Sequence, residues 1–301
     1  MMQRANIHRR YTIYMDTKGK LYLCATPIGN LGDISERVLE TLRTADIIAA
    51  EDTRNSIKLL NKFDIKTPLT SYHEYNKYDK AEYLIKEMMS GKNIALITDA
   101  GTPAISDPGE VLVKMSCTAG IEVTSLPGPS AVITALTLSG LSTRRFVFEG
   151  FLSTDKKERA EVLEELKNET RTIVIYEAPH HLKETLKQLY DTMGDRKTAL
   201  CRELTKIHET IQRMRLSDAI AYYQEEDPRG EYVLVIEGRS REEKKAEAQA
   251  AFADMSIEEH MSLYTDRGID KKEAMKRVAS DRGIQKREVY AALLQGKGES
   301  I

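Results

Sequence analysis

The amino-acid sequence predicts an α/β protein with two α/β domains and a small helical module after them. Three observations indicate this architecture. Short apolar runs alternate with amphipathic stretches from residue 20 onward, which is typical of β-α-β units. Near residue 140 a second series of such runs begins with a different spacing. After Gly238 the chain becomes highly charged and then wholly helical, and 301 residues are enough for two domains with such an appendage.

The first series predicts a mostly parallel five-stranded sheet covered by helices. Several of its apolar runs show no alternation, as expected of strands buried on both faces. The expected strands are 21–26, 46–51, 67–72, 93–98 and 121–126, and the expected helices are 33–45, 54–63, 77–90 and 108–119. In the first helix Ile34, Val38 and Leu42 form one apolar stripe.

The second series predicts a different, mixed sheet. Its expected strands are 145–150, 172–177, 197–203, 209–214 and 231–238, and its expected helices are 155–168, 178–192 and 216–225. The runs 197–203 and 209–214 follow one another without room for a helix, so they favour antiparallel pairing. We therefore expect an extension over 1–19, α/β domains over 20–135 and 136–240, and a linker with a helical tail over 241–301.

The tail has clear helix signals. Ser256 with Glu259, and Asp270 with Glu273, have the spacing of capping boxes, and Gly283 can end the helix before it, as Gly268 can for the previous one. Residues 271–294 resemble a helix-turn-helix. The stretch 271–297 holds eight Lys or Arg against three Asp or Glu. Such a hairpin could bind nucleic acid, close a domain or support a dimer interface; its candidate RNA-binding residues are Lys271, Lys272, Lys276, Arg277, Lys286 and Arg287.

The composition argues against several classes of protein. A net charge of −2 gives the whole chain no attraction to a polyanion, so a nucleic-acid partner would need a local basic patch. Cys24, Cys117 and Cys201 lie in apolar runs and are expected to be reduced, buried thiols in a cytoplasmic protein. Residues 1–19 lack the apolar segment of a signal peptide, and no apolar run is long enough to span a membrane.

Three loops rich in Gly and Pro follow expected strands of the first sheet. They are TPIGN (26–30), DAGTPAISDPG (99–109) and PGPSA (127–131). Because parallel strands end at one edge of a sheet, these loops should meet there and form a ligand site. No dinucleotide or P-loop phosphate motif occurs, and neither does a zinc motif. The adjacent His180 and His181 would point in different directions on a helix, so we expect no metal.

Eight motifs in order carry a resemblance to a known family. They are TPIGNLGDIS (26–35), AAEDTR (49–54), DAGTPAISDPG (99–109), PGPSA (127–131), FEGFL (148–152), YEAPHHL (176–182), RELTKIHET (202–210) and GEYVLVIEG (230–238). Over about residues 20–240 the chain resembles the ribosomal RNA small subunit methyltransferase I family of the tetrapyrrole methylase superfamily. The tail resembles the helix-turn-helix extension that many members carry.

The resemblance implies a function, a cofactor and partners. It implies transfer of a methyl group from S-adenosylmethionine to the ribose 2′-hydroxyl of a cytidine in 16S ribosomal RNA, within the small ribosomal subunit. It also implies a homodimer whose two α/β domains hold the cofactor in a cleft between them. Matched motif by motif, the candidate cofactor-binding residues are Pro27, Gly29, Asp99, Gly101, Thr102, Ile105, Ser130, Ala131, Tyr176, Glu177, Gly230 and Glu231. Thr102 stands where the tetrapyrrole enzymes have a carboxylate.

Methyl transfer from a sulfonium needs mainly positioning, and a general base would help a weakly nucleophilic hydroxyl. Candidate bases are Glu51 and Asp52, and the second domain offers the cluster Arg202, Glu203, Lys206, His208 and Glu209. We place Glu51, Asp52, Arg54 and Lys206 in the active cleft, without assigning the proton to one of them. Asp52 could equally cap a helix, Glu203 could form a fixed ion pair, and the two cations could bind phosphate.

Two other functions remain open at this point. Methylation of a tetrapyrrole or another small molecule would use the same cofactor loops but leave the basic tail without a task. A non-enzymatic nucleic-acid-binding protein would use the tail but leave the three loops unexplained.

Overall fold

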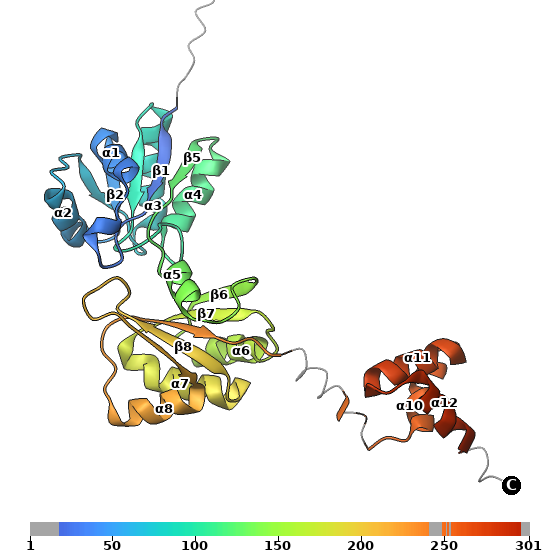
Figure 1. Cartoon of the computed structure of the whole chain (residues 1–301). Helices are drawn as coiled ribbons and strands as arrows, with labels where there is room; N and C mark the ends of the chain where they lie inside the picture. Colours follow the sequence, from blue (N-terminus) through green and yellow to red (C-terminus); the bar gives the residue numbers. More distant parts are fainter. Residues whose placement is uncertain (1–17, 241–248, 251, 253, 296–301) are drawn as a thin grey trace, which may run out of the picture.

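A computed structural model describes residues 18–240, 249–250, 252 and 254–295 of the chain. The expected extension over 1–19 and the charged linker after Gly238 lie largely outside these described residues. Within them, two five-stranded sheets follow one another along the chain, and three helices form a separate unit at the C-terminal end (Figure 1).

The first sheet is parallel throughout, with the strand order β3-β2-β4-β1-β5. Its strands are β1 (Lys20–Cys24), β2 (Ile47–Ala50), β3 (Leu69–Ser71), β4 (Ile94–Ile97) and β5 (Glu122–Leu126). Every residue of β2 and β4 is buried, as the apolar runs without alternation predict. The predicted parallel five-stranded sheet is confirmed.

Helices cover both faces of the first sheet. Helices α1 (Glu36–Thr44) and α2 (Thr53–Lys62) contribute to the core on one face, and α3 (Lys77–Met89) and α4 (Gly109–Thr118) to the core on the other. Helix α1 begins later than expected because residues Leu31–Asp33 form a 3-10 turn and the Ser35 side chain caps the helix by accepting from the Val38 backbone N–H. Val38 and Leu42 are fully buried, as the predicted stripe requires.

The second sheet is mixed, with the order β6-β7-β10-β8-β9. Its strands are β6 (Phe146–Phe151), β7 (Thr172–Glu177), β8 (Lys197–Arg202), β9 (Thr210–Arg215) and β10 (Tyr232–Ile236). Strands β6 and β7 are parallel, and the other pairs are antiparallel. Helices α6 (Lys156–Lys167), α7 (Pro179–Met193) and α8 (Leu216–Glu225) share the core of one face. The predicted change of sheet type is confirmed.

The other face of the second sheet packs against α5 (Ala131–Leu138). The expected helices do not include this one, because its sequence AVITALTL is rich in β-branched residues that favour strands. Val132, Ala135 and Leu136 pack against Val174 of β7 and Val233 of β10. Helix α5 therefore connects the two sheets and belongs by packing to the second (Figure 1).

The C-terminal unit consists of α10 (Ile257–Thr265), α11 (Lys271–Arg282) and α12 (Lys286–Gln295). The predicted capping box at Ser256 is present in full, and Asp270 caps α11 by accepting from two backbone N–H groups. Gly283 ends α11 with φ +66°, a left-handed conformation that suits glycine. Met261, Ala274, Val278, Ala279 and Val289 form a small core of their own.

One expectation about the cysteines is wrong. Cys24 and Cys201 are buried, but Cys117 is exposed. On α4 the buried positions are Gly109, Leu112 and Ser116, and Cys117 lies one residue further around the helix, on the solvent side. The sequence predicts this helix but does not decide which residues near its C-terminal end face the core. Within the described residues, no helix has the length and apolar character to cross a membrane.

Candidate active site

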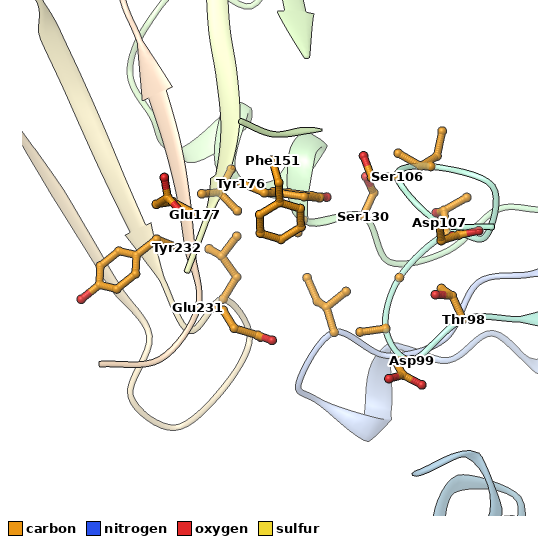
Figure 2. Close-up of a pocket in the computed structure, with 18 of the residues that line it drawn as sticks. Thr98, Asp99, Ser106, Asp107, Ser130, Phe151, Tyr176, Glu177, Glu231 and Tyr232 are labelled. Atoms are coloured by element: carbon orange, nitrogen blue, oxygen red, sulfur yellow. The ribbon is translucent and has the colours of Figure 1, made fainter. Parts of the chain in front are cut away.

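A cavity of about 600 Å³ lies between the loops of the first sheet and one edge of the second (Figure 2). All three predicted loops contribute to its wall. The lining from the first sheet and its loops is Ile28, Glu51, Thr98, Asp99, Ala100, Gly101, Thr102, Ile105, Ser106, Asp107, Ser130 and Ala131. The lining from the second sheet and its loops is Phe151, Tyr176, Glu177, Ala178, Pro179, Cys201, Leu204, Lys206, Glu231, Tyr232 and Val233.

The wall from the first sheet is acidic. Thr98 Oγ1 donates a 3.0 Å hydrogen bond to Glu51 Oε2. Burial raises the pKa of Glu51, and the nearby carboxylates of Asp99 and Asp107 act in the same direction. Burial also raises the pKa of Asp107, whose Oδ1 accepts from two backbone N–H groups, whereas its buried Oδ2 has no hydrogen-bond partner among the described residues. These carboxyl groups favour a cationic ligand.

The loop over 99–109 has a strained backbone. Ala104 and Ser106 have φ values of +66° and +59°, which cost free energy for residues with a side chain. Gly101 anchors the start of the loop, since it exchanges two backbone hydrogen bonds with Thr26, at 2.9 and 3.0 Å. Strain of this kind persists where surrounding contacts determine the conformation, and Ser106 of this loop lines the cavity.

The opposite wall comes from β7 and β10, which pair Tyr176 with Val233 and Glu177 with Tyr232. Glu177 is buried and already engaged: it accepts from the Ala178 backbone N–H and from Thr185 Oγ1. Burial raises the pKa of Tyr176, so its phenol stays neutral. This wall is therefore mostly aromatic and apolar, and its other carboxylate, Glu231, is paired with Lys206.

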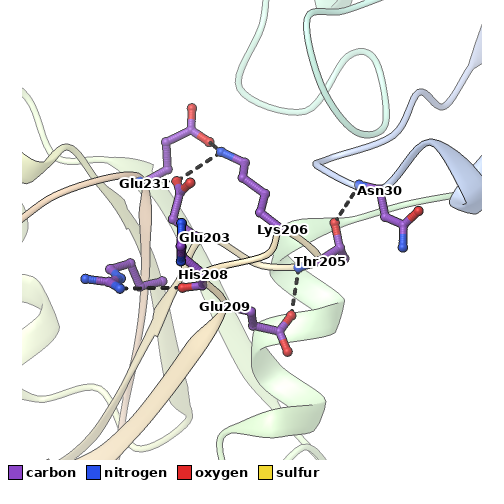
Figure 3. Close-up of polar contacts among 8 residues, drawn as sticks. Asn30, Glu203, Thr205, Lys206, His208, Glu209 and Glu231 are labelled. Carbon is purple, nitrogen blue, oxygen red and sulfur yellow. Dashed lines mark hydrogen bonds and ion pairs between the residues drawn. The ribbon is translucent and has the colours of Figure 1, made fainter.

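Lys206 lies at one end of the cavity in a clamp of two carboxylates, Glu203 and Glu231 (Figure 3). Its Nζ is 3.0 Å from Glu203 Oε1 and 2.9 Å from Glu231 Oε2. Burial alone would lower the pKa of Lys206, but the hydrogen bonds to the two carboxylates outweigh it and raise the pKa. Glu203 and Thr205 both have positive φ, at +52° and +64°, so the loop that presents Lys206 is strained as well.

Two of the predicted cofactor glycines lie behind this clamp and do not line the cavity. A Cβ on Gly29 would lie 2.4 Å from Lys206 Cγ, and a Cβ on Gly230 would lie 2.6 Å from the Glu203 carboxyl carbon. In addition, the Asn30 backbone N–H donates to Thr205 Oγ1 at 3.1 Å, a contact between the two halves of the molecule (Figure 3). The absence of a side chain at these two positions therefore leaves the space that Lys206 and Glu203 occupy.

Pro27, Asp52 and Arg54 are also absent from the cavity wall. Asp52 is the N-cap of α2, and its carboxylate accepts from the backbone and the guanidinium of Arg54. These hydrogen bonds lower the pKa of Asp52 to about 2. Arg54 is 88% exposed. Asp52 therefore acts as a helix cap, which is the alternative that the sequence left open. Its backbone N–H donates to Asp99 Oδ1, so Asp52 lies next to the cavity.

The structure gathers the remaining sequence-based candidates and adds several more. Glu51, Lys206 and nine of the twelve cofactor candidates line the cavity, the nine being Asp99, Gly101, Thr102, Ile105, Ser130, Ala131, Tyr176, Glu177 and Glu231. Residues that sequence reasoning did not single out include Thr98, Asp107, Phe151 and Tyr232. Asp107, Phe151 and Tyr232 lie inside the quoted motifs, so their place in a motif is the one signal that the sequence offers for them.

The basic candidates of the tail lie at the surface of α11 and α12. Lys271 and Lys272 begin α11, and Lys286 and Arg287 begin α12, all exposed. Lys276 and Arg277 each form an ion pair with Glu273 on their own helix. The described residues contain no group of three or more His, Cys, Asp or Glu side chains that could hold a metal ion.

Comparison with known proteins identifies this arrangement. The sequence model of the Tetrapyrrole (Corrin/Porphyrin) Methylases matches residues 20–220. The chain is 45% identical to "Ribosomal RNA small subunit methyltransferase I" of Synechocystis sp., over 92% of this chain and 98% of that protein. It is 47% identical to the protein of the same name in Bacillus subtilis, over 91% and 94%. In fold it is similar to uroporphyrin-III-C-methyltransferase from Thermus thermophilus, with a TM-score of 0.53 and 19% identity over 73% of this chain and 94% of that one.

Proposed function

Because this chain belongs to the ribosomal RNA small subunit methyltransferase I family of tetrapyrrole methylases, we propose that it methylates 16S ribosomal RNA in the small ribosomal subunit. The methyl donor is S-adenosylmethionine, and the acceptor is the ribose 2′-hydroxyl of a cytidine. The observation that carries this proposal is the cavity of about 600 Å³ between the two sheets, with an acidic wall on one side and an aromatic wall on the other.

The residues of the cavity suit S-adenosylmethionine. Its sulfonium is cationic, and Glu51, Asp99 and Asp107 line one wall with carboxyl groups. Asp107 also holds a buried oxygen with no hydrogen-bond partner among the described residues, ready to accept from a ligand. When bound, the cofactor supplies an electrophilic methyl group and leaves as a neutral thioether. The nine lining residues from the sequence-based set would hold it.

Glu51 is the residue best placed to take the hydroxyl proton. Burial raises its pKa, which makes its carboxylate a stronger base than that of an exposed glutamate. Thr98 holds one carboxylate oxygen, which fixes the orientation of the group and leaves the other oxygen for the proton. Lys206 lies at the other end of the cavity, where Glu203 and Glu231 hold its ammonium in place and offset its charge. Its remaining N–H would orient the ribose by a hydrogen bond.

The tail and a second copy of the chain complete the proposal. Exposed Lys286 and Arg287 on α12, with Lys271 and Lys272 on α11, would contact phosphates of the RNA without reading its sequence. The enzyme would act as a homodimer in the cytoplasm. Deleting residues 245–301 should then weaken binding to the small subunit more than binding of the cofactor, whereas an equal loss of both would make the tail structural.

The decisive experiment offers three methyl acceptors to the purified full-length protein with tritiated S-adenosylmethionine. The acceptors are small subunits from cells that lack this modification, naked 16S rRNA, and a tetrapyrrole precursor. Label in the small subunit, located by nuclease digestion and mass spectrometry on a cytidine ribose, is the expected result. Label in the tetrapyrrole alone would establish the small-molecule alternative. Failure to bind the cofactor in calorimetry would leave only a nucleic-acid-binding protein.

A further inference from the structure

Phe151 is an aromatic side chain that the fold leaves in water at the cavity. It ends β6, lines the cavity and is 60% exposed. Figure 2 shows its ring between the side chains of the second sheet and those from the loops of the first. Burying a phenylalanine side chain is one of the larger favourable contributions to folding, and here most of that contribution is not realised. Packing of the core therefore does not explain its position.

An irregularity in β6 aims this ring at the cavity. Phe148 pairs with Val174 and Gly150 pairs with Ile175, so one extra residue interrupts the register between them. Phe151 consequently pairs with Tyr176 and lies on the same face of the sheet as Phe148 and Val174. In a regular strand, residues three apart point to opposite faces. Without this β-bulge Phe151 would point toward the α6 and α7 side.

The bulge depends on glycine. Gly150 has a φ of +65°, and a Cβ there would lie 2.9 Å from Ser106 Oγ of the strained loop across the cavity. The β6 backbone therefore lies close to the Ser106 side chain of the opposite wall. Bulges next to functional sites often serve to redirect one side chain, and here the redirected side chain is Phe151.

The ring is also held in a fixed orientation from one side. Phe151 contacts Tyr176 at 5.4 Å between ring centroids, and Tyr176 contacts Phe148 at 4.9 Å. These three rings lead from the core beneath α5 to the cavity surface. An aromatic ring that is held by one tilted neighbour and is otherwise largely exposed offers a preformed surface for a planar ligand.

We propose that Phe151 is the stacking platform for the base of the nucleotide that is methylated. This inference rests on the proposed function. Proteins that act on an unpaired nucleotide commonly stack its base on an exposed aromatic side chain. Stacking there would hold the nucleotide so that its ribose faces the acidic wall with Glu51. The exposed position of Phe151 favours the RNA base over the cofactor adenine, because a macromolecular substrate reaches the mouth of the cavity more easily than its interior, which the small cofactor can enter.

Ile105, from the loop at the same end as Ser106, is half exposed and also lines the cavity. It provides apolar surface on the first-sheet side, whereas Phe151 provides it on the second-sheet side. A base that enters between Ile105 and Phe151 would be shielded from water on both of its faces. Stacking tolerates any base, so Phe151 positions the nucleotide and leaves its identity to other contacts.

The test compares three variants of the full-length enzyme. Phe151→Leu keeps apolar volume but removes the ring, Phe151→Tyr keeps the ring, and Phe146→Leu is the matched control at the other end of β6, outside the cavity lining. Cofactor binding is measured by calorimetry, and methylation kinetics are measured against small subunits. For Phe151→Leu we expect a 5- to 150-fold higher KM for small subunits, on the order of one lost base stack, with the cofactor dissociation constant unchanged. Phe151→Tyr and Phe146→Leu should remain close to wild type.

Three results would overturn the inference while leaving the proposed function intact. They are an unchanged KM in Phe151→Leu, a loss confined to cofactor binding, which would assign the ring to the adenine, and a defect in Phe151→Tyr as large as in Phe151→Leu. Wild-type enzyme that binds the cofactor but labels no small subunits would instead refute the proposed function, and this inference with it.

Discussion

The cavity region and the C-terminal helical unit carry their charged groups in opposite ways. In the cavity, acidic groups are partly removed from water, and burial raises the pKa of Glu51 and of Asp107. In the tail, Lys271, Lys272 and Lys286 lie at the surface. Charges in a cavity act on a bound ligand over short distances, whereas exposed charges act through the ionic atmosphere and are screened by salt. Chemistry and RNA affinity should therefore be separable by mutation.

The placement of the exposed charges supports this division. Lys271 with Lys272, and Lys286 with Arg287, occupy the first positions of α11 and α12. Cations at a helix N-terminus oppose the helix dipole, which favours anions there. These residues therefore do not serve the stability of their helices. At α11 the Asp270 carboxylate already accepts from two of the free backbone N–H groups, so a phosphate would be held there by the cations.

The largest expected effect is that of Glu51→Gln. Removing the proposed base should lower kcat for methylation of small subunits by about 10²- to 10⁴-fold, with cofactor affinity much less changed. Asp52→Asn is the control, since asparagine can still cap α2. Single-turnover methylation and calorimetry give the two quantities. A Glu51→Gln enzyme with normal kcat would remove Glu51 from the chemistry.

The same residue predicts a pH dependence. Burial raises the pKa of Glu51 above its ordinary value of 4.5, so acidification protonates this carboxylate at a higher pH than an exposed glutamate. The proposed base is active only when ionised. The kcat/KM of the wild type should thus fall as the pH drops through that raised pKa. The residual activity of Glu51→Gln should lack this acid limb, and an identical limb in both would assign it to another group.

A smaller loss is expected from Lys206→Met, which leaves the carboxylates of Glu203 and Glu231 without their shared cation. Loss of charged hydrogen bonds of this kind corresponds to about a 10- to 150-fold decrease in kcat/KM for small subunits. Lys206→Arg should recover part of the activity because it keeps the charge. If both variants retain wild-type kinetics, the clamp serves only to join the two halves of the molecule.

Mutations in the tail should change the salt dependence of binding to small subunits and leave the rate of methyl transfer unchanged. Replacing both Lys286 and Arg287 with Gln should reduce the slope of log K against log salt for small-subunit binding by about 0.7 to 0.9 per lost phosphate contact. Cofactor binding should not change. Lys66→Gln, an exposed lysine of the first α/β unit, provides the control. An unaltered slope in the double variant would mean that α12 does not meet the RNA backbone.

The smallest effect concerns stability alone. Ser256→Ala removes the capping box of α10 and should destabilise the three-helix unit by about 0.5–2 kcal/mol. Because that unit has its own core, hydrogen exchange should accelerate in α10, α11 and α12 but not in the two sheets. Equal acceleration in β2 and β4 would show that the two regions unfold together, contrary to the comparison.

Elements defined by local pattern could be predicted with little error. The apolar runs without alternation become the fully buried β2 and β4, and the short interval between 197–203 and 209–214 becomes the antiparallel pair β8 and β9. The capping signal at Ser256 appears in full. In each case the structure depends on residues close together in sequence, or on the regular spacing of apolar residues that burial requires.

Residues whose role depends on another part of the chain could not be assigned in this way. Asp52 and Glu51 are adjacent in sequence, yet Asp52 caps α2 while Glu51 lines the cavity. Gly29 and Gly230 belong to loop motifs, but their lack of a side chain accommodates Lys206 and Glu203. These differences depend on side chains that are distant in sequence, namely Thr98 for Glu51, Lys206 for Gly29 and Glu203 for Gly230.

The sequence by itself determined the two kinds of sheet, the edge at which the Gly- and Pro-rich loops meet, the basic helical tail and the family. These follow from periodicity, from turn chemistry and from motifs in a fixed order. Only the tertiary structure decided that Asp52 and Arg54 do not line the cavity that Glu51 and Lys206 share, and that Phe151 faces it. One extra residue in β6 reverses the face to which Phe151 points, and this register is set by pairing with β7, which the sequence of β6 alone does not encode.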